Sequence, residues 1–216
     1  MPHNNTLKKI EDFSRERLKD DNSGHDFEHT DRVRKLAIKI CQSLNANVFI
    51  VEASALLHDV GDRKFFETKE DGENFVIEYI NNLEITEDEK EQIIHIIKNL
   101  SFSSELQGKI LESIEGYCVQ DADRIDGLGA IGIGRAFMYA SKKNNPMYTF
   151  TNIRALDNAN EYMIHESGAI NHLLEKMPLV VKNLKTNLGK EIGAKRYKFL
   201  QEFTKKFIQE WNLEDI

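Results

Sequence analysis

Three short polar segments of the chain contain residue types that bind metal ions. The pair His58-Asp59 ends the apolar stretch 51–57. Burying an imidazole and a carboxylate beside such a stretch is costly unless something compensates. A divalent cation would compensate, because it binds a neutral imidazole and an ionised carboxylate together. The alternative is a helix C-terminus, where the helix dipole favours a histidine and Asp59 faces solvent.

The other two segments are equally ambiguous when each is taken alone. His25 and His29 are four residues apart, so one helix face could carry both, but this spacing is also common by chance. Asp121, Asp123 and Asp126 open an apolar segment, where acidic residues are favoured at a helix start without any function. Along the chain the three segments give His, then His-Asp, then Asp.

In this order the segments resemble the HD-domain metal-dependent phosphohydrolase superfamily, and more closely its small bacterial hydrolases of the YpgQ and YedJ type. The resemblance extends from about residue 20 to 212. The matching segments are His25-Asp26-x-x-His29-x-x-Arg32-Val33, His58-Asp59-Val60-Gly61-Asp62-x-Lys64-Phe65, Ser101-Phe102-Ser103, Gln120-Asp121-Ala122-Asp123-Arg124-Ile125-Asp126, Gly129-Ala130-Ile131-Gly132-Ile133-Gly134-Arg135, Thr186-x-x-Gly189-Lys190, Arg196 and Glu210-Trp211.

The resemblance implies that one divalent cation is held by His29, His58, Asp59 and Asp123. Two imidazoles and two carboxylates suit Mn²⁺, which we favour, as well as Fe²⁺, Ni²⁺ or Zn²⁺, and they do not exclude Mg²⁺. Such a cation lowers the pKa of a bound water and stabilises charge on a phosphoryl group. We therefore expect Asp59 to take part in catalysis through the metal.

The resemblance also implies candidates for proton transfer and substrate binding. Asp62 stands where a related subgroup has a proposed catalytic carboxylate, so we expect it to shuttle a proton. The alternative is a solvated loop acid or a partner for Arg63. Cations and one histidine are candidates for binding phosphate, although each could be an ordinary surface residue. These candidates are Lys64, His172, Lys176, Lys190 and Arg196.

Three further polar residues have roles that the sequence leaves open. Asp126 could share a helix face with Asp123 and hydrogen-bond to a metal-ligating side chain, which would fix the orientation of that side chain. His95 stands among isoleucines, which favours a core histidine over a ligand. His25 has the spacing of a ligand but no assigned part.

We expect helices to position these residues. Apolar residues recur at spacings of three and four, and no segment alternates with period two. We expect an all-α HD-type fold forming one domain over 1–216, with a core over about 20–141, an irregular excursion over 142–167 and C-terminal helices over 168–212 that wall the cleft. Gly127-x-Gly129-x-x-Gly132 fits a dinucleotide-binding fingerprint, but no strand precedes it, so a Rossmann domain is excluded. The expected helices span about 5–20, 26–44 and 48–60, with Gly61 where the last of these should end. A polar loop over 68–72 precedes a helix that contains 75–80, and a cap at Thr86-Glu87-Asp88-Glu89 opens a helix through 93–97. Further helices are expected from near 105 and over 117–141, 168–188 and 190–212.

Composition narrows the possible partners. The chain has 216 residues and a net charge of −7, which argues against a large nucleic-acid interface but allows a local basic pocket for a small anion. No apolar run approaches membrane-spanning length. The two cysteines form no CxxC pair, and no secretory signal begins the chain, so we expect a cytoplasmic protein with reduced core thiols. The oligomeric state is not indicated.

The predicted function is metal-dependent hydrolysis of a nucleotide. In the YpgQ-like relatives the implied reaction is pyrophosphohydrolysis of nucleoside triphosphates. Phosphatase or cyclic-nucleotide phosphodiesterase activity at the same site remains an alternative, as does a non-catalytic metal- or nucleotide-binding regulatory module. A third hypothesis is a purely structural helical protein. It would require His29, His58, Asp59 and Asp123 to match the ligand pattern by coincidence.

Overall fold

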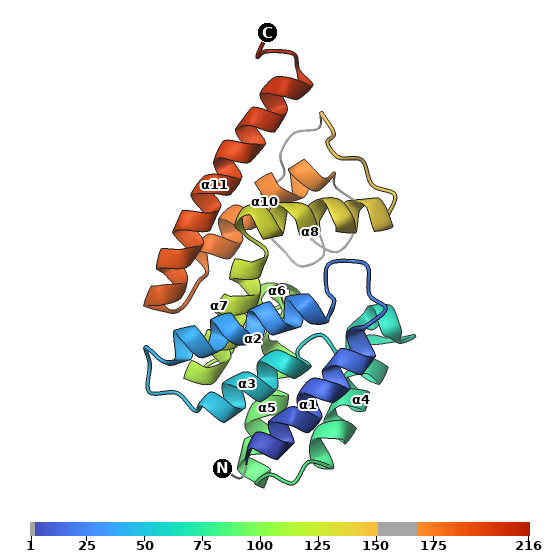
Figure 1. The fold of residues 1–216 in the computed structure, drawn as a ribbon, viewed down its shortest axis with the longest axis vertical. Helices are drawn as coiled ribbons and strands as arrows, with labels where there is room; N and C mark the ends of the chain where they lie inside the picture. Colours follow the sequence, from blue (N-terminus) through green and yellow to red (C-terminus); the bar gives the residue numbers. More distant parts are fainter. Residues whose placement is uncertain (1–2, 151–167) are drawn as a thin grey trace. The chain divides into compact units, whose positions relative to one another are not determined.

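The computed structural model describes residues 3–150 and 168–216, and within those ranges every regular element is a helix (Figure 1). The predicted all-α fold is therefore confirmed. The elements are α1 (His3–Leu18), α2 (Phe27–Cys41), α3 (Val48–Leu57), the 3₁₀ helix η1 (Arg63–Phe65), α4 (Lys69–Asn81), α5 (Glu87–Asn99), α6 (Phe102–Leu106), α7 (Ile114–Asp126), α8 (Gly129–Lys142), α10 (Ala169–Lys182) and α11 (Asn187–Trp211).

The chain forms two compact units. The first comprises residues 1–21 and 25–122, and the second comprises residues 22–24 and 123–216. Helix α7 contributes its first part to one unit and its last four residues to the other. The single domain over 1–216 stays a prediction.

Helix α3 is the core of the first unit and contacts α1, α2 and α5. Its sequence is apolar on all sides, as expected for a helix that is enclosed by neighbours. The hydroxyl of Ser14 in α1 donates a hydrogen bond of 2.7 Å to the Leu56 carbonyl, one of the last carbonyls of α3, which lack partners within the helix. The end of α3, where His58 and Asp59 follow, is thereby held inside the unit.

Side-chain caps define the starts of the helices around this core. Asn47 caps α3, and Thr86 forms a capping box with Glu89 at the start of α5, as the sequence predicts. Thr68 forms a second capping box with Asp71 at the start of α4. Each cap satisfies backbone N–H groups that have no partner within the helix.

Several helix boundaries differ from the prediction. Helix α4 begins at Lys69, inside the expected polar loop, because Thr68 caps it. Helix α3 ends at Leu57 rather than near 60, which makes His58 its C-cap. The helix predicted to begin near Glu105 already begins at Phe102, because Ser101 caps it. The predicted helix over 117–141 is two helices, since Gly129 begins α8 with a φ of +67°, a left-handed conformation that breaks the helix.

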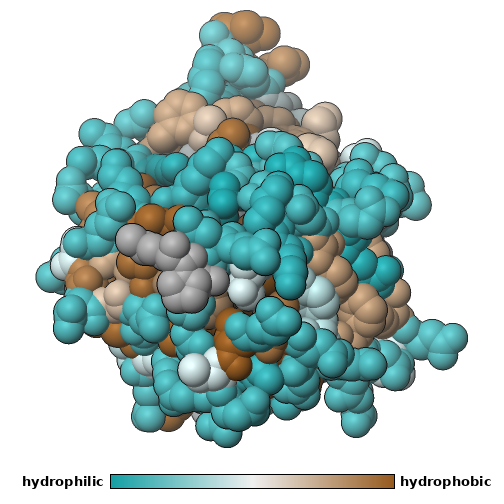
Figure 2. Space-filling view, turned by 60° about the horizontal axis from the view of Figure 1, so that its bottom comes forward, coloured by the Kyte–Doolittle hydropathy of each residue, from teal (hydrophilic) through white to brown (hydrophobic). Residues whose placement is uncertain are grey.

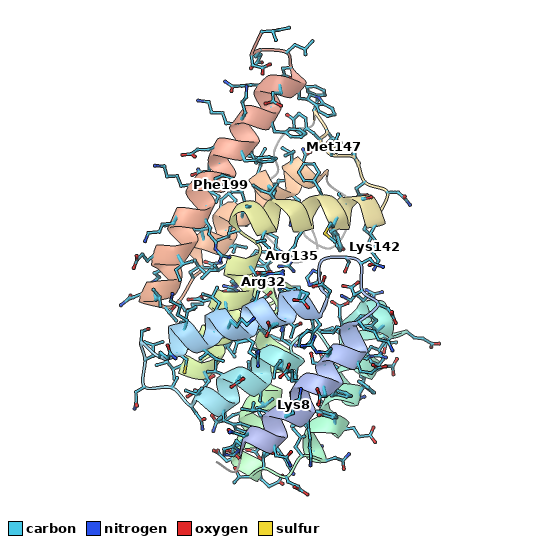
Figure 3. All side chains as sticks on the ribbon, viewed as in Figure 1. Lys8, Arg32, Arg135, Lys142, Met147 and Phe199 are labelled. Carbon is cyan, nitrogen blue, oxygen red and sulfur yellow. The ribbon has the colours of Figure 1, made fainter. Side chains whose placement is uncertain are left out.

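The second unit is built from α8, α10 and α11, which contact one another. Rings of Phe137, Phe203, Phe207, Tyr148 and Trp211 pack together along α8 and α11, with neighbouring centroids 5.7–6.5 Å apart. Met147 and Phe199, labelled in Figure 3, are each about half exposed. Of the predicted excursion, residues 143–150 are non-helical, and residues 151–167 lie outside the described part.

The surface is mainly polar. Hydrophilic residues cover most of the face drawn in Figure 2, and hydrophobic residues appear there in small separate groups. Among the helices of residues 3–150 and 168–216, none combines the length and apolar character that crossing a membrane requires.

Candidate metal centre

Two helix ends place three of the predicted ligands. His58 and Asp59 follow the last residue of α3, and His29 stands in the first turn of α2. Asp26 fixes that first turn, because its carboxylate accepts a hydrogen bond of 2.8 Å from the His29 backbone N–H. The His29 side chain is fully buried and that of His58 nearly so. The helix packing therefore positions both imidazoles before any ligand binds.

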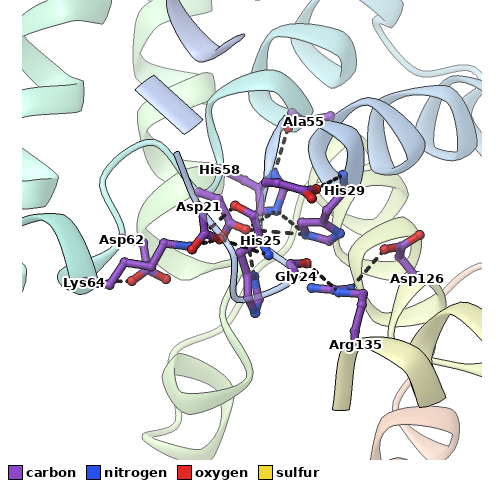
Figure 4. A network of polar contacts seen from close by, with 12 residues as sticks. Asp21, Gly24, His25, His29, Ala55, His58, Asp62, Lys64, Asp126 and Arg135 are labelled. Carbon is purple, nitrogen blue, oxygen red and sulfur yellow. Dashed lines mark hydrogen bonds and ion pairs between the residues drawn. The ribbon is translucent and has the colours of Figure 1, made fainter. Parts of the chain in front are cut away.

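The three side chains converge on one point. The Nε2 atoms of His29 and His58 are 3.3 Å apart, and each is 3.4 Å from Oδ2 of Asp59. Figure 4 shows His29 and His58 within this network of polar contacts. The three atoms thus form a nearly equilateral triangle.

This triangle fits a divalent transition-metal ion. Neighbouring ligand atoms on one cation are about 3.0–3.4 Å apart when the metal–ligand bonds are about 2.1 Å long. The observed separations of 3.3 and 3.4 Å match that spacing. The arrangement of His29, His58 and Asp59 is therefore compatible with three ligands of one ion.

The protonation states also fit a cation. Nδ1 of His58 is 2.8 Å from the Ala55 carbonyl and donates to it, so in the neutral ring, which is the form that binds a metal, Nε2 carries the lone pair. Burial alone raises the pKa of Asp59, but the positive charge of His58 and His25 when these rings are protonated, with hydrogen bonds from His25 and His29, outweighs burial and holds this pKa well below its usual value. Asp59 is consequently an ionised carboxylate at neutral pH.

His25 joins this group, although the sequence left its role open. Its Nδ1 is 2.9 Å from Oδ2 of Asp59, and ligand atoms of His25, His29 and Asp59 all lie within 4.8 Å of one another. The side chain is about one third exposed, unlike those of His29 and His58. The structure therefore assigns His25 a contact with Asp59. We call His25, His29, His58 and Asp59 the His–Asp cluster.

Asp21 is a polar residue near the cluster that sequence reasoning missed. Its buried carboxylate accepts hydrogen bonds from the His25 backbone N–H at 3.1 Å and from the Lys64 ammonium at 2.9 Å. Lys64 is also 3.4 Å from the His25 carbonyl. In the sequence Asp21 stands in a polar stretch that reads as an ordinary solvated loop, so no local signal marks it.

The predicted proton shuttle, Asp62, has a structural contact as well. Its carboxylate accepts a hydrogen bond of 2.8 Å from the Lys64 backbone N–H and caps η1. Its predicted alternative, an ion pair with Arg63, is not among the contacts of the described residues. The catalytic role of Asp62 stays a prediction.

The second unit contains the remaining predicted residues. Asp123, the predicted fourth ligand, is the first residue of this unit in α7. Asp126 forms an ion pair of 3.0 Å with Arg135, whose Nε donates a hydrogen bond of 2.7 Å to the Gly24 carbonyl (Figure 4). The carboxylate of Asp126 is therefore engaged in an ion pair with Arg135. Metal ligation by Asp123 stays a prediction.

The predicted phosphate binders of the second unit have contacts of their own. Arg196 donates a hydrogen bond of 2.9 Å to the Ile125 carbonyl. Burial, together with the nearby ammonium of Lys176, lowers the pKa of His172 to about 3, so this imidazole is neutral at pH 7. Lys190 is exposed near the start of α11. Their binding roles stay predictions.

His95, the histidine expected in the core, lies in α5 beside Asn99. Its ring Nδ1 is 3.3 Å from the Asn99 amide nitrogen. It is exposed, so the expectation of a core histidine is wrong; the buried residues of α5 are Ile93 and Ile96.

Comparison with known proteins identifies the class. The family model described as HD domain matches residues 26–128, which include the whole His–Asp cluster except His25. YpgQ of Bacillus subtilis (strain 168) is 32% identical over 191 residues, which cover 87% of this chain and 85% of YpgQ. The chain belongs to the HD-domain superfamily and is a metal-dependent phosphohydrolase of HD type, as the sequence predicts.

Solved structures extend the likeness to nearly the whole chain. A structure from Lactobacillus plantarum has a TM-score of 0.89 at 32% identity and covers 97% of this chain and 98% of that one. An HD-superfamily hydrolase from Bacillus thuringiensis has a TM-score of 0.72 at 35% identity, with coverage of 96% and 97%. YpgQ from Bacillus subtilis in complex with ADP has a TM-score of 0.74 at 29% identity, with coverage of 94% and 97%.

Proposed function

We propose that this protein is a nucleotide pyrophosphohydrolase that cleaves nucleoside triphosphates and releases pyrophosphate. The convergence of His29, His58 and Asp59 at 3.3–3.4 Å carries the proposal, because it supplies the donor set of a phosphohydrolase metal. The ADP complex of its relative YpgQ supports a nucleotide as the ligand.

A divalent cation, for which we favour Mn²⁺, would supply a water of lowered pKa and stabilise charge on the phosphoryl group. The residues of the chain prepare the site for it. The hydrogen bond from His58 Nδ1 to the Ala55 carbonyl fixes the ring orientation, and Nε2 of His58 lies 3.3 Å from Nε2 of His29. His25 contacts the same Asp59 oxygen and orients that carboxylate.

Asp62 and Lys64 lie in the segment that follows Asp59. We assign Asp62 to accept the proton that the attacking water loses and to transfer it to solvent, because its carboxylate is only partly buried. Lys64 contacts the His25 carbonyl, so its ammonium stands beside the His–Asp cluster and would attract a phosphate oxygen.

A product assay tests the proposal. Nucleoside mono-, di- and triphosphates and cyclic nucleotides are incubated with and without Mn²⁺, and orthophosphate is resolved from pyrophosphate. We expect metal-dependent release of pyrophosphate from triphosphates. Orthophosphate as the sole product would instead establish a phosphatase. Tight binding of one metal ion per chain without any turnover would contradict the enzyme and favour a regulatory module.

A further inference from the structure

Arg17, in the last turn of α1, has an unusual environment. Its guanidinium carbon lies 5.1, 4.8 and 5.1 Å from the ring centroids of Phe65, Phe66 and Phe75. These distances are within the range of cation–π attraction. We call the three rings with Arg17 the Arg17 cage.

Within residues 3–150 and 168–216, Arg17 forms neither an ion pair nor a hydrogen bond through its side chain. Its Nε is buried without an acceptor. The contrast with other arginines of the unit is clear, because Arg34 binds Asp31 and Glu52, and Arg15 binds Glu11. Arg17 is thus a cation that aromatic rings hold in place while its donors lack an oxygen partner.

The geometry of a guanidinium determines what such a cage can bind. Aromatic rings interact with the flat faces of the group, whereas its N–H donors point outward in the plane. The Nε–H is buried, so the two terminal Nη groups of Arg17 are the donors that remain available for a planar arrangement of oxygen atoms. Phosphate and carboxylate oxygens match this fork in a bidentate manner.

The cage is rigid and stands next to a second cation. Phe75 also packs against Phe13 and Phe66, at centroid distances of 5.8 and 5.3 Å. The Lys64 ammonium lies 4.8 Å from the same Phe65 ring that Arg17 contacts, so the two cations are within about 10 Å of each other. Lys64 in turn contacts the backbone of His25 in the His–Asp cluster.

We propose that Arg17 binds the terminal phosphate of a di- or triphosphate chain whose other end lies at the His–Asp cluster. The proposal rests on the proposed nucleotide hydrolase function and names the part of the substrate that this residue recognises. A row of contacts joins Asp59 to His25, Lys64, the Phe65 ring and Arg17, so the two cations stand on the same side of the unit as the His–Asp cluster's Asp59 contact with His25. Arg17 consequently discriminates between nucleotides by the length of the phosphate chain.

Binding of inorganic tripolyphosphate tests the proposal without requiring turnover. The full chain, treated with a chelator to remove metal, is titrated by calorimetry as wild type and as Arg17→Met. We expect the substitution to weaken binding about 10-fold or more, since it removes the charge and keeps a side chain that fills the cage. Arg17→Lys keeps the charge but not the fork, and we expect an intermediate loss.

Arg15→Met is the matched control. Arg15 also lies in α1 and over a ring, at 3.9 Å from the Phe27 centroid, but it pairs with Glu11. We expect tripolyphosphate to bind this variant within about twofold of wild type. Equal losses in the Arg15 and Arg17 variants would reveal only a general charge effect and would overturn the proposal.

Kinetics separate this proposal from the proposed function. We expect Arg17→Met to raise KM for a triphosphate far more than the inhibition constant of a nucleoside monophosphate, with kcat nearly unchanged. If wild type turns over a triphosphate and Arg17→Met has the same KM, the phosphate subsite at Arg17 is overturned, while the proposed hydrolase function stands. Absence of all nucleotide turnover would overturn the hydrolase, while the calorimetry would still decide whether Arg17 binds a phosphate chain. A lower melting temperature with unchanged tripolyphosphate binding would make the cage purely structural and overturn the subsite.

Discussion

The His–Asp cluster and the Arg17 cage lie in the same unit, yet opposite physical chemistry holds their charges. In the cluster the Asp59 carboxylate is surrounded by imidazoles, with contacts of 2.9–3.4 Å. In the cage the Arg17 guanidinium is surrounded by three benzene rings and has no carboxylate partner among the described residues. An ionised carboxylate among imidazoles is prepared for a cation, whereas a cation without an oxygen partner among the described residues is prepared for an anion. A metal-dependent enzyme acting on phosphate needs both.

Removing the carboxylate of the His–Asp cluster should have the largest effect. We expect Asp59→Ala to lose bound metal and at least about 10³-fold in turnover, because only neutral imidazoles remain at the triangle. Elemental analysis measures the metal, a product assay measures turnover, and circular dichroism checks that helicity persists. Asp12→Ala, at an exposed carboxylate in α1 that pairs with Lys8, should leave metal and rate unchanged. Retained turnover in Asp59→Ala would refute the metal centre.

Asp62→Asn should distinguish proton transfer from metal binding at the edge of the same cluster. The amide oxygen of Asn can still accept the hydrogen bond from the Lys64 backbone N–H, so the η1 cap persists. We expect kcat to fall about 10²-fold while the metal content stays constant, and we expect one limb of the pH–rate profile to disappear. Loss of metal would place Asp62 among the ligands. An unchanged kcat would leave Asp62 as a cap alone.

Gly61 connects the two regions, since it stands between Asp59 of the cluster and Phe65 of the cage. The sequence predicts that Gly61 ends the preceding helix. Helix α3 ends earlier, however, and Gly61 does not adopt a positive φ. The actual requirement is space. A Cβ at Gly61 would lie 2.6 Å from the Gly72 carbonyl oxygen and 2.9 Å from Val76 Cγ2. Backbone of α4 therefore packs directly against the Gly61 backbone.

We expect Gly61→Ala to destabilise the protein by about 2–3 kcal/mol, because the α4 backbone must move away. Gly134→Ala is the control, since a Cβ there meets no atom within 4 Å and Ala favours the α8 helix. Urea denaturation measures both. A Gly61→Ala midpoint equal to that of wild type would contradict the close contact. Phosphate-chain binding by the variant would then show whether the cage depends on this contact.

The sequence predicted the cluster better than the cage for a physical reason. His29, His58 and Asp59 belong to short motifs at helix ends, and the order of these motifs along the chain resembles the HD-domain superfamily, which implies a metal site. Arg17 carries no such signal, because its environment is made by Phe65 and Phe75 from segments that follow it by more than forty residues. Contacts of that kind depend on tertiary packing and cannot be read from helical periodicity.

The same reasoning explains the helix boundaries. The capping box of Thr86 and Glu89 is local, and it was predicted correctly. The break at 127–129 was missed because the apolar pattern continues through it. There, a Cβ at Gly132 would clash with the Gly127 carbonyl, so backbone proximity rather than hydrophobic pattern ends α7 and starts α8. Glycines in a helical pattern are thus ambiguous until the packing is known.

Lys64 contacts both the His–Asp cluster and the Arg17 cage. Of the Asp59, Asp62, Gly61 and Lys64 substitutions, we expect Lys64→Met to have the smallest effect. Asp21 holds its ammonium at 2.9 Å and is itself buried, so Lys64→Met removes a cation from beside a buried carboxylate. We expect a loss of about 2 kcal/mol in the free energy of unfolding and a rise in KM of about 10-fold without loss of metal.

A double-mutant cycle with Asp21→Asn separates these two effects of Lys64→Met. The neutral amide at position 21 no longer needs a cation, so the double variant should recover part of the stability that Lys64→Met loses. The raised KM should persist, because the phosphate chain still lacks the Lys64 ammonium between the His–Asp cluster and the Arg17 cage. Recovery of KM together with stability would mean that Lys64 only neutralises Asp21. The path between the two regions would then contain one cation, Arg17, instead of two.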